Sequence, residues 1–138
     1  MHRPTGRFSR SDRVLESRDY RRISRCGSRS ASKNFVVLAA PMRDLATRDR
    51  PGCGGRLGVT VSRRVGNAVT RNRVKRRIRE WFRKVRSELA TDTEIVVIAR
   101  REAAEIDWQS TTADLTQLLE QANRAARTRR SKQASQFA

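Results

Sequence analysis

The segment that most constrains the fold is a long amphipathic stretch, GNAVTRNRVKRRIREWFRKVRSEL, at residues 66–89. Its large apolar residues recur every three or four positions, which places them on one face of an α-helix. These residues are Val74, Ile78, Trp81, Phe82, Val85 and Leu89. Burying such side chains is worth roughly 1.5–3 kcal/mol each, so this helix must lie against an apolar surface. Asn67 is a candidate N-cap for the helix.

Three further segments predict a sheet that provides this surface. Residues 34–40 (NFVVLAA) have the composition of a strand. Residues 56–62 alternate, which indicates a strand with one apolar face formed by Leu57, Val59 and Val61. Residues 94–100 (EIVVIAR) are a continuous apolar run, as expected of a strand covered on both faces.

Two more helices complete the predicted order. Residues 17–24 begin with Ser17 as a plausible N-cap, and Gly27 is the expected end of this helix. Residues 107–126 contain a last helix whose inward positions are Leu115, Leu118, Leu119 and Ala122. Residues 41–55, between the first two strands, are expected to be a loop. The order α-β-β-α-β-α predicts a small α+β sandwich on a single sheet.

The length of 138 residues predicts one domain. Residues 1–12 and 126–138 are basic and without pattern, so we expect disordered ends. No segment is long and apolar enough for a membrane span, and the N-terminus does not have the features of a secretory signal. Cys26 and Cys53 lack metal-site spacing and His2 is the one histidine, which favours a reduced, cytoplasmic protein without its own metal site.

The charge of the chain indicates a polyanionic partner. There are 32 basic and 14 acidic residues, a formal net charge of +18, and such a charge repels itself. Nucleic acid is the leading candidate and an anionic membrane the second. The apolar face of the long helix is expected to be buried, whereas a membrane-surface helix needs that face free for lipid. The opposite face carries cations about one turn apart, a spacing that suits successive phosphates of a folded RNA.

Three features of this region leave alternatives open. Asn72 could bind a base edge, a 2′-hydroxyl or a metal-bound water, or could make a local hydrogen bond near the helix start. Arg63 and Arg64 lie before the helix N-terminus, where free N–H groups can bind an anion, although a plain turn also fits. Tyr20 and Phe35 could stack an unpaired base, although aromatic residues at such spacing are more often core.

The segment RLGVTVSRRVGNAVTRNRVKRRIREWFR (residues 56–83) resembles the signature of the protein subunit of bacterial ribonuclease P. The strand, the Ser-Arg-Arg junction, VGNAV and RNRVKR stand in the order and spacing of that family. EIVVIAR resembles the family's next strand and RDYRRI its first helix, so the resemblance covers residues 13–125. It implies a ribosomal protein S5 domain 2-like fold with a left-handed βαβ crossover, although general handedness rules favour the right-handed form in ~98% of cases.

The resemblance also implies a function. Members of this family bind a catalytic RNA and assist it in removing the 5′ leader of precursor tRNA. The catalytic RNA binds the phosphodiester of the substrate that is cleaved, and it holds most of the Mg²⁺. No catalytic or metal-binding residue is therefore expected in the protein. The free protein should be monomeric. Carried over by position, the residues that contact the catalytic RNA are Arg71, Asn72, Arg73, Lys75, Arg76 and Arg79. Those of the leader-binding cleft are Tyr20, Phe35, Thr60, Ser62 and Arg64.

One departure and two alternatives qualify this interpretation. Ser24 stands where many family members carry a second aromatic residue, so we expect weaker base stacking. A structural protein that binds ribosomal RNA or assists ribosome assembly could use the same helix. A metal-dependent nuclease acting alone would need clustered carboxylates or a histidine pair, and the sequence offers no convincing set.

Overall fold

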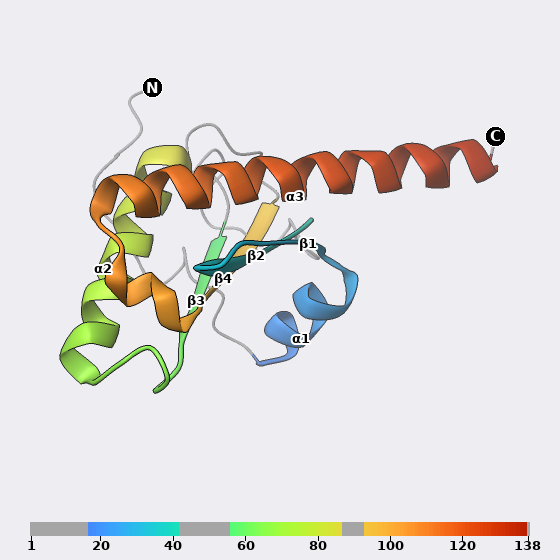
Figure 1. Ribbon diagram of the computed structural model, residues 1–138. Coiled ribbons are helices and arrows are strands. Elements are labelled where there is room, and N and C mark those ends of the chain that lie inside the picture. The colour runs from blue at the N-terminus through green and yellow to red at the C-terminus, as the bar shows by residue number, and fades with distance from the viewer. Residues whose placement is uncertain (1–16, 42–55, 87–92, 138) are drawn as a thin grey trace, which may run out of the picture.

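A four-stranded sheet with helices on both faces forms the centre of the protein (Figure 1). The computed structural model describes residues 17–41, 56–86 and 93–137. In chain order the elements are α1 (Ser17–Cys26), β1 (Ser28–Ala31), β2 (Phe35–Pro41), β3 (Arg56–Val61), α2 (Ala68–Val85), β4 (Thr93–Ala99), the 3₁₀ helix η4 (Arg101–Glu105) and α3 (Trp108–Phe137). The predicted small α+β fold is confirmed, and the expected loop at residues 41–55 lies almost wholly outside the described residues.

The strands lie in the order β1-β2-β4-β3. β2 is antiparallel to both β1 and β4, whereas β3 and β4 are parallel. The helix α2 connects these two parallel neighbours, so β3, α2 and β4 form the βαβ crossover that the resemblance implies. The left-handed sense of that crossover stays a prediction.

Two elements are missing from the predicted order. The strand β1 has the sequence SRSA, too short and too polar to resemble a strand. Its alternate residues Ser28 and Ser30 are nevertheless buried, and the Ser30 hydroxyl donates a hydrogen bond of 2.7 Å to Gln121 of α3. The second missed element is η4, which follows β4 directly. Both are short elements stabilised by tertiary contacts rather than by a local pattern.

The main core lies between the sheet and the two helices α2 and α3. The apolar stripe predicted for α2 is confirmed as far as it is described, since Val74, Ile78, Trp81 and Phe82 are buried and Val85 packs at the edge of the core. Leu89 lies outside the described residues. The predicted N-cap is also confirmed, because the Asn67 side chain accepts a hydrogen bond of 2.9 Å from the backbone N–H of Thr70.

The last helix covers the same face of the sheet. Its predicted inward residues are all buried: Leu115, Leu118, Leu119 and Ala122. Asp107 precedes it and accepts a hydrogen bond of 2.7 Å from the backbone N–H of Ser110, and this bond lowers the pKa of Asp107. The helix continues to Phe137, through a segment for which the sequence predicts a loose tail. This extension contains no Gly or Pro and projects past the sheet (Figure 1).

Among the described elements, α1 is the helix that covers the opposite face of the sheet. Ile23 of α1 is fully buried in a small second core with residues of β2 and β4, namely Val36, Leu38, Ala40 and Val96. The helix ends before Gly27, as predicted, and the Gly27 N–H donates a hydrogen bond of 2.8 Å to the carbonyl oxygen of Ile23. A Cβ at Gly27 would lie 2.5 Å from that oxygen, so a side chain does not fit there. This contact fixes where the chain turns from α1 into β1.

Candidate nucleic-acid interface

The sheet face below α1 is only partly covered. Every second residue of β3 points to this face, and the strand register pairs Gly58 with Val96 and Thr60 with Ile98 of β4. Gly58 lies beneath Tyr20 of α1, whereas Thr60 is exposed. α1 therefore covers one end of this face and leaves the carboxyl ends of β3 and β4 accessible.

Tyr20 of α1 packs against the sheet at the covered end of this face. Its ring lies directly on the backbone of β3 at Gly58. A Cβ at Gly58 would lie 2.6 Å from the Tyr20 hydroxyl oxygen and 2.8 Å from its ring carbon Cζ, so any side chain there would have to displace the ring. Partial burial raises the pKa of the Tyr20 hydroxyl, and a hydrogen bond with the Val59 backbone opposes this rise. The phenol is therefore neutral at physiological pH, and its half-buried ring lies beside the open part of the face.

Phe35 does not belong to this face, and its assignment to the cleft is wrong. Its side chain is fully buried in the main core, on the side of α2 and α3. Its neighbour Val36 is one of the β2 residues that face α1. The run FVVLAA is apolar at every position, so no alternation in the sequence shows which residues point to which face.

A basic pocket lies at the carboxyl ends of β3 and β4. It is lined by Ser62, Arg64, Ala99, Arg100 and Arg101. The structure thus brings the predicted residues Ser62 and Arg64 together, with Thr60 at the preceding outward position of β3. The serine hydroxyl and the guanidinium groups are donors that suit phosphate oxygens.

Arg100 and Arg101 were not predicted as site residues. They follow the strand β4, which is parallel to β3, and the ends of parallel neighbours meet at one edge of the sheet. That edge is where ligands commonly bind in sheets of this kind. The predicted strand ends at Arg100, and Arg101 follows it directly. These two arginines were therefore a usable signal, had the parallel pairing been known.

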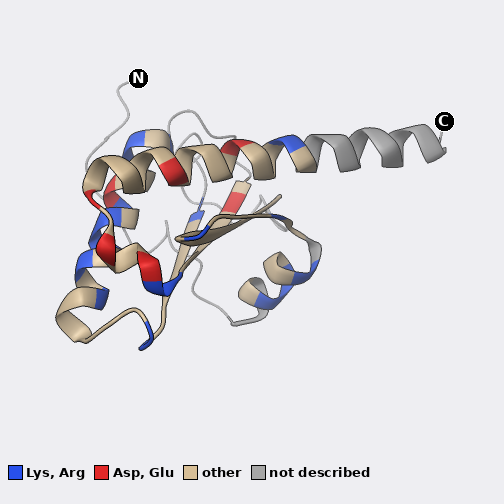
Figure 2. Cartoon of the chain, in the orientation of Figure 1, with Lys and Arg blue, Asp and Glu red and all other residues tan. Residues whose placement is uncertain are grey.

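The second basic surface lies along α2 (Figure 2). Asn72, Arg73 and Arg76 are exposed, and the other predicted RNA-contacting residues are half-buried: Arg71, Lys75 and Arg79. One ion pair on α2 joins Arg83 to Glu80 at 3.0 Å. Within the described ranges, no carboxylate pairs with Arg71, Arg73, Lys75 or Arg76. The predicted cationic row is therefore present on the surface, and its contact with RNA stays a prediction. Asn72 is exposed within this row, and its contact with RNA likewise stays a prediction.

The basic residues on one flank of α2 instead make contacts within the protein. The Arg77 guanidinium donates a hydrogen bond of 2.7 Å to the carbonyl oxygen of Ile106, between η4 and α3. The Lys84 ammonium lies 5.1 Å from the centre of the Trp108 ring, within the range of a cation–π contact. Arg73 lies between the exposed row and this flank. It is exposed, and it also donates a longer hydrogen bond of 3.4 Å to the carbonyl oxygen of Ala104.

Neither a metal-binding cluster nor a membrane-spanning helix is found among the described residues. No group of three or more His, Cys, Asp or Glu side chains among them could hold a metal ion. None of the described helices is sufficiently long and apolar to cross a membrane.

The fold and these surfaces define a small α+β sandwich with two basic surfaces, one along α2 and one at the sheet edge. The chain matches the family model for Ribonuclease P over residues 8–123. A ribonuclease P protein component from Shouchella clausii is 34% identical over 115 residues, which are 83% of this chain and 88% of that protein. Its counterpart in Syntrophus aciditrophicus is 36% identical and covers 81% and 87% of the two chains.

Solved structures agree with these sequence matches. The RNase P protein of Staphylococcus aureus superimposes with a TM-score of 0.68 at 33% identity, over 80% of this chain and 94% of that one. The RNase P protein of Thermotoga maritima gives a TM-score of 0.65 at 31% identity, over 79% and 96%. This chain belongs to the ribonuclease P protein family. It is therefore the protein component of an endoribonuclease that processes the 5′ end of tRNA, in partnership with ribonuclease P RNA.

Proposed function

We propose that the exposed row on α2 binds the catalytic RNA, while the face below α1 and the basic pocket bind the 5′ leader of precursor tRNA. The observation that carries this division is the separation of the two basic surfaces, which are joined by the turn at residues 62–67. Arg64 belongs to the pocket, and Asn67 begins the helix that carries the row. Two strands of nucleic acid could thus bind on either side of this one turn.

In this proposal the protein binds and orients while the RNA performs the chemistry. A leader phosphate lies between Arg64, Arg100 and Arg101, where charge-assisted hydrogen bonds are favourable. A leader base lies against Tyr20, whose ring gives stacking without sequence selectivity. Mg²⁺ supplies charge stabilisation and an activated water at the scissile phosphate, and we assign it mainly to the RNA. The protein is monomeric when free, and this role implies a cytoplasmic location.

A cleavage assay tests this function. Precursor tRNA is incubated at low Mg²⁺ with the protein alone, with the catalytic RNA alone and with both. We expect cleavage at the mature 5′ end to be strongly stimulated when both are present, because the protein adds cationic contacts to a polyanionic complex. We expect no cleavage by the protein alone.

Each result of this assay has a defined meaning. Cleavage by the protein alone would replace the proposal with a metal-dependent nuclease. Binding to the RNA without any stimulation of cleavage would favour a structural RNA-binding role. A substrate with a single leader nucleotide serves as the control, because the protein should improve its binding much less than that of a full leader.

The substitution Gly58→Ala tests the role of Tyr20. The added methyl group would lie 2.6 Å from the Tyr20 hydroxyl oxygen and must displace the ring. We expect leader-dependent affinity to fall about fivefold or more, since a stacked base is worth about 1–3 kcal/mol. Affinity for mature tRNA should not change. The control is Gly58→Ala in a Tyr20→Ala background, where a further loss would show that the methyl group acts by another route.

A further inference from the structure

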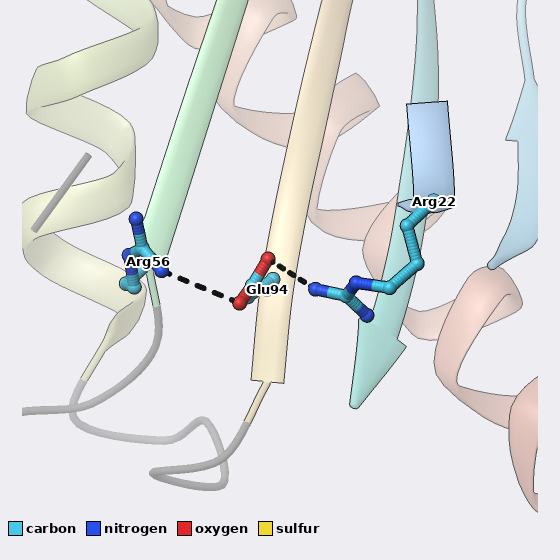
Figure 3. A network of polar contacts seen from close by, with 3 residues as sticks. All are labelled: Arg22, Arg56 and Glu94. Carbon is cyan, nitrogen blue, oxygen red and sulfur yellow. Dashed lines mark hydrogen bonds and ion pairs between the residues drawn. The ribbon is translucent and has the colours of Figure 1, made fainter. Parts of the chain in front are cut away.

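The buried carboxylate of Glu94 joins three elements of the fold (Figure 3). Its side chain is only 2% exposed. One carboxylate oxygen lies 2.9 Å from a guanidinium nitrogen of Arg22 in α1, and the other lies 3.5 Å from one of Arg56 at the start of β3. Glu94 itself belongs to β4, so a single charged group links α1 to both parallel strands.

This network lies in line with the leader-binding face. The strand register pairs Arg56 with Glu94, Gly58 with Val96, and Thr60 with Ile98. These positions alternate along the strands and point to the α1 side of the sheet. The face therefore runs from the Glu94 network, past Tyr20 above Gly58, to Thr60 and the basic pocket. The network lies at the end of the face opposite to the pocket.

The network also contacts α1 on one flank, through Arg22. Ile23 anchors α1 in the second core. Tyr20 lies on one side of Ile23 around the helix and Arg22 lies on the other, because successive residues are about 100° apart. A contact at Ile23 alone would let α1 roll about its axis, whereas contacts on both flanks prevent this. The Tyr20 ring packs closely on Gly58, which has no side chain, and the Arg22 guanidinium forms an ion pair with Glu94.

We infer that Glu94 is a positioning residue, which acts through Arg22 to fix the roll of α1 and thereby holds the Tyr20 ring where the leader passes. The inference rests on the proposed function for its consequence in leader binding. Its structural part, the dependence of the Tyr20 position on the Arg22–Glu94 pair, holds for the free protein. No contact between Glu94 and RNA is required.

Tyr20 is the one tyrosine of the chain, so fluorotyrosine incorporation gives a single fluorine NMR resonance from this ring. The test variant is Arg22→Met, which keeps an apolar stem of similar length but removes the charge and leaves Glu94 beside Arg56. The matched control is Arg21→Met, which makes the same change one residue earlier on the exposed side of α1. Arg22→Lys is the rescue variant, because it restores a cation opposite Glu94.

We expect Arg22→Met to shift or broaden the Tyr20 resonance in the free protein, with Arg21→Met unchanged and Arg22→Lys close to wild type. In the reconstituted holoenzyme, Arg22→Met should weaken binding of leader-containing substrate about fivefold relative to mature tRNA, the loss expected of a misplaced stacking ring. Affinity for the catalytic RNA should be the same for Arg22→Met and Arg21→Met.

An unchanged Tyr20 resonance in folded Arg22→Met would overturn the inference, whatever the tRNA measurements show. Glu94→Gln keeps the shape of the side chain and removes its charge, and provides the same test if Arg22→Met does not fold. The Tyr20 resonance could shift while the affinity for leader-containing substrate relative to mature tRNA stays unchanged. That result would support the positioning of α1 and overturn the leader-binding role of Tyr20. The two failures are therefore distinguishable.

Discussion

Replacing both Arg73 and Arg76 by alanine is expected to reduce the salt dependence of catalytic-RNA binding by about two units of log–log slope, because each lost phosphate contact removes roughly one. Affinity at ~0.1 M salt should fall about tenfold or more. Both residues are exposed on α2 and pair with no carboxylate in the described part of the chain. The measurement is a titration of the RNA with protein over a series of salt concentrations.

The control for this experiment removes the same charge elsewhere. Arg25 of α1 and Arg29 of β1 are also exposed and lie outside the proposed RNA-binding row. Their double alanine variant should retain the wild-type slope, apart from a small general effect of the lower net charge. If both double variants lost the same slope, binding would depend on total charge, and the α2 row would have no special role.

The substitution Trp81→Ala is expected to lower the free energy of unfolding by about 3–5 kcal/mol, the usual cost of deleting a buried aromatic side chain. Trp81 belongs to α2, and its side chain is 0% exposed in the main core. Its indole N–H donates a hydrogen bond of 3.1 Å to the Thr116 hydroxyl. A domain of this kind has a total stability of about 5–15 kcal/mol, so much of the protein should be unfolded at moderate urea concentrations. Urea denaturation followed by circular dichroism measures the change.

Val69→Ala is the matched control, because Val69 lies on the same helix and is 77% exposed. We expect its effect on stability to lie within about 0.5 kcal/mol. Equal losses for the two variants would mean that the apolar stripe of α2 does not anchor the helix. Burial of that stripe would then not explain how the exposed cations of α2 are kept in position.

The elements that the sequence predicted best are those with a strong local period. The apolar stripe of α2, its N-cap at Asn67 and the exposed position of Arg76 all follow from residues within a few turns of one another. Helical geometry converts such spacing directly into faces. The same reasoning placed Leu115 and Ala122 correctly on the inner side of α3.

Other features depend on contacts between distant segments. The short strand β1 has no apolar pattern, and its serines are buried because α3 lies across them. Arg77 and Arg76 are adjacent in sequence and equal in charge, yet Arg77 binds the Ile106 carbonyl while Arg76 is exposed. Helical geometry places the two side chains about 100° apart, but the position of the η4–α3 junction decides that Arg77 has a partner in the protein.

For the candidate site, the sequence by itself determined that a buried apolar stripe would hold a row of cations on the opposite face of one helix. The tertiary structure decided which side chains share the face that we propose binds the leader: it excluded Phe35, added Arg100 and Arg101, and placed Tyr20 on Gly58. The physical reason is that a helix fixes its faces through local geometry, whereas a fully apolar strand acquires its faces only when its neighbours in the sheet are in place.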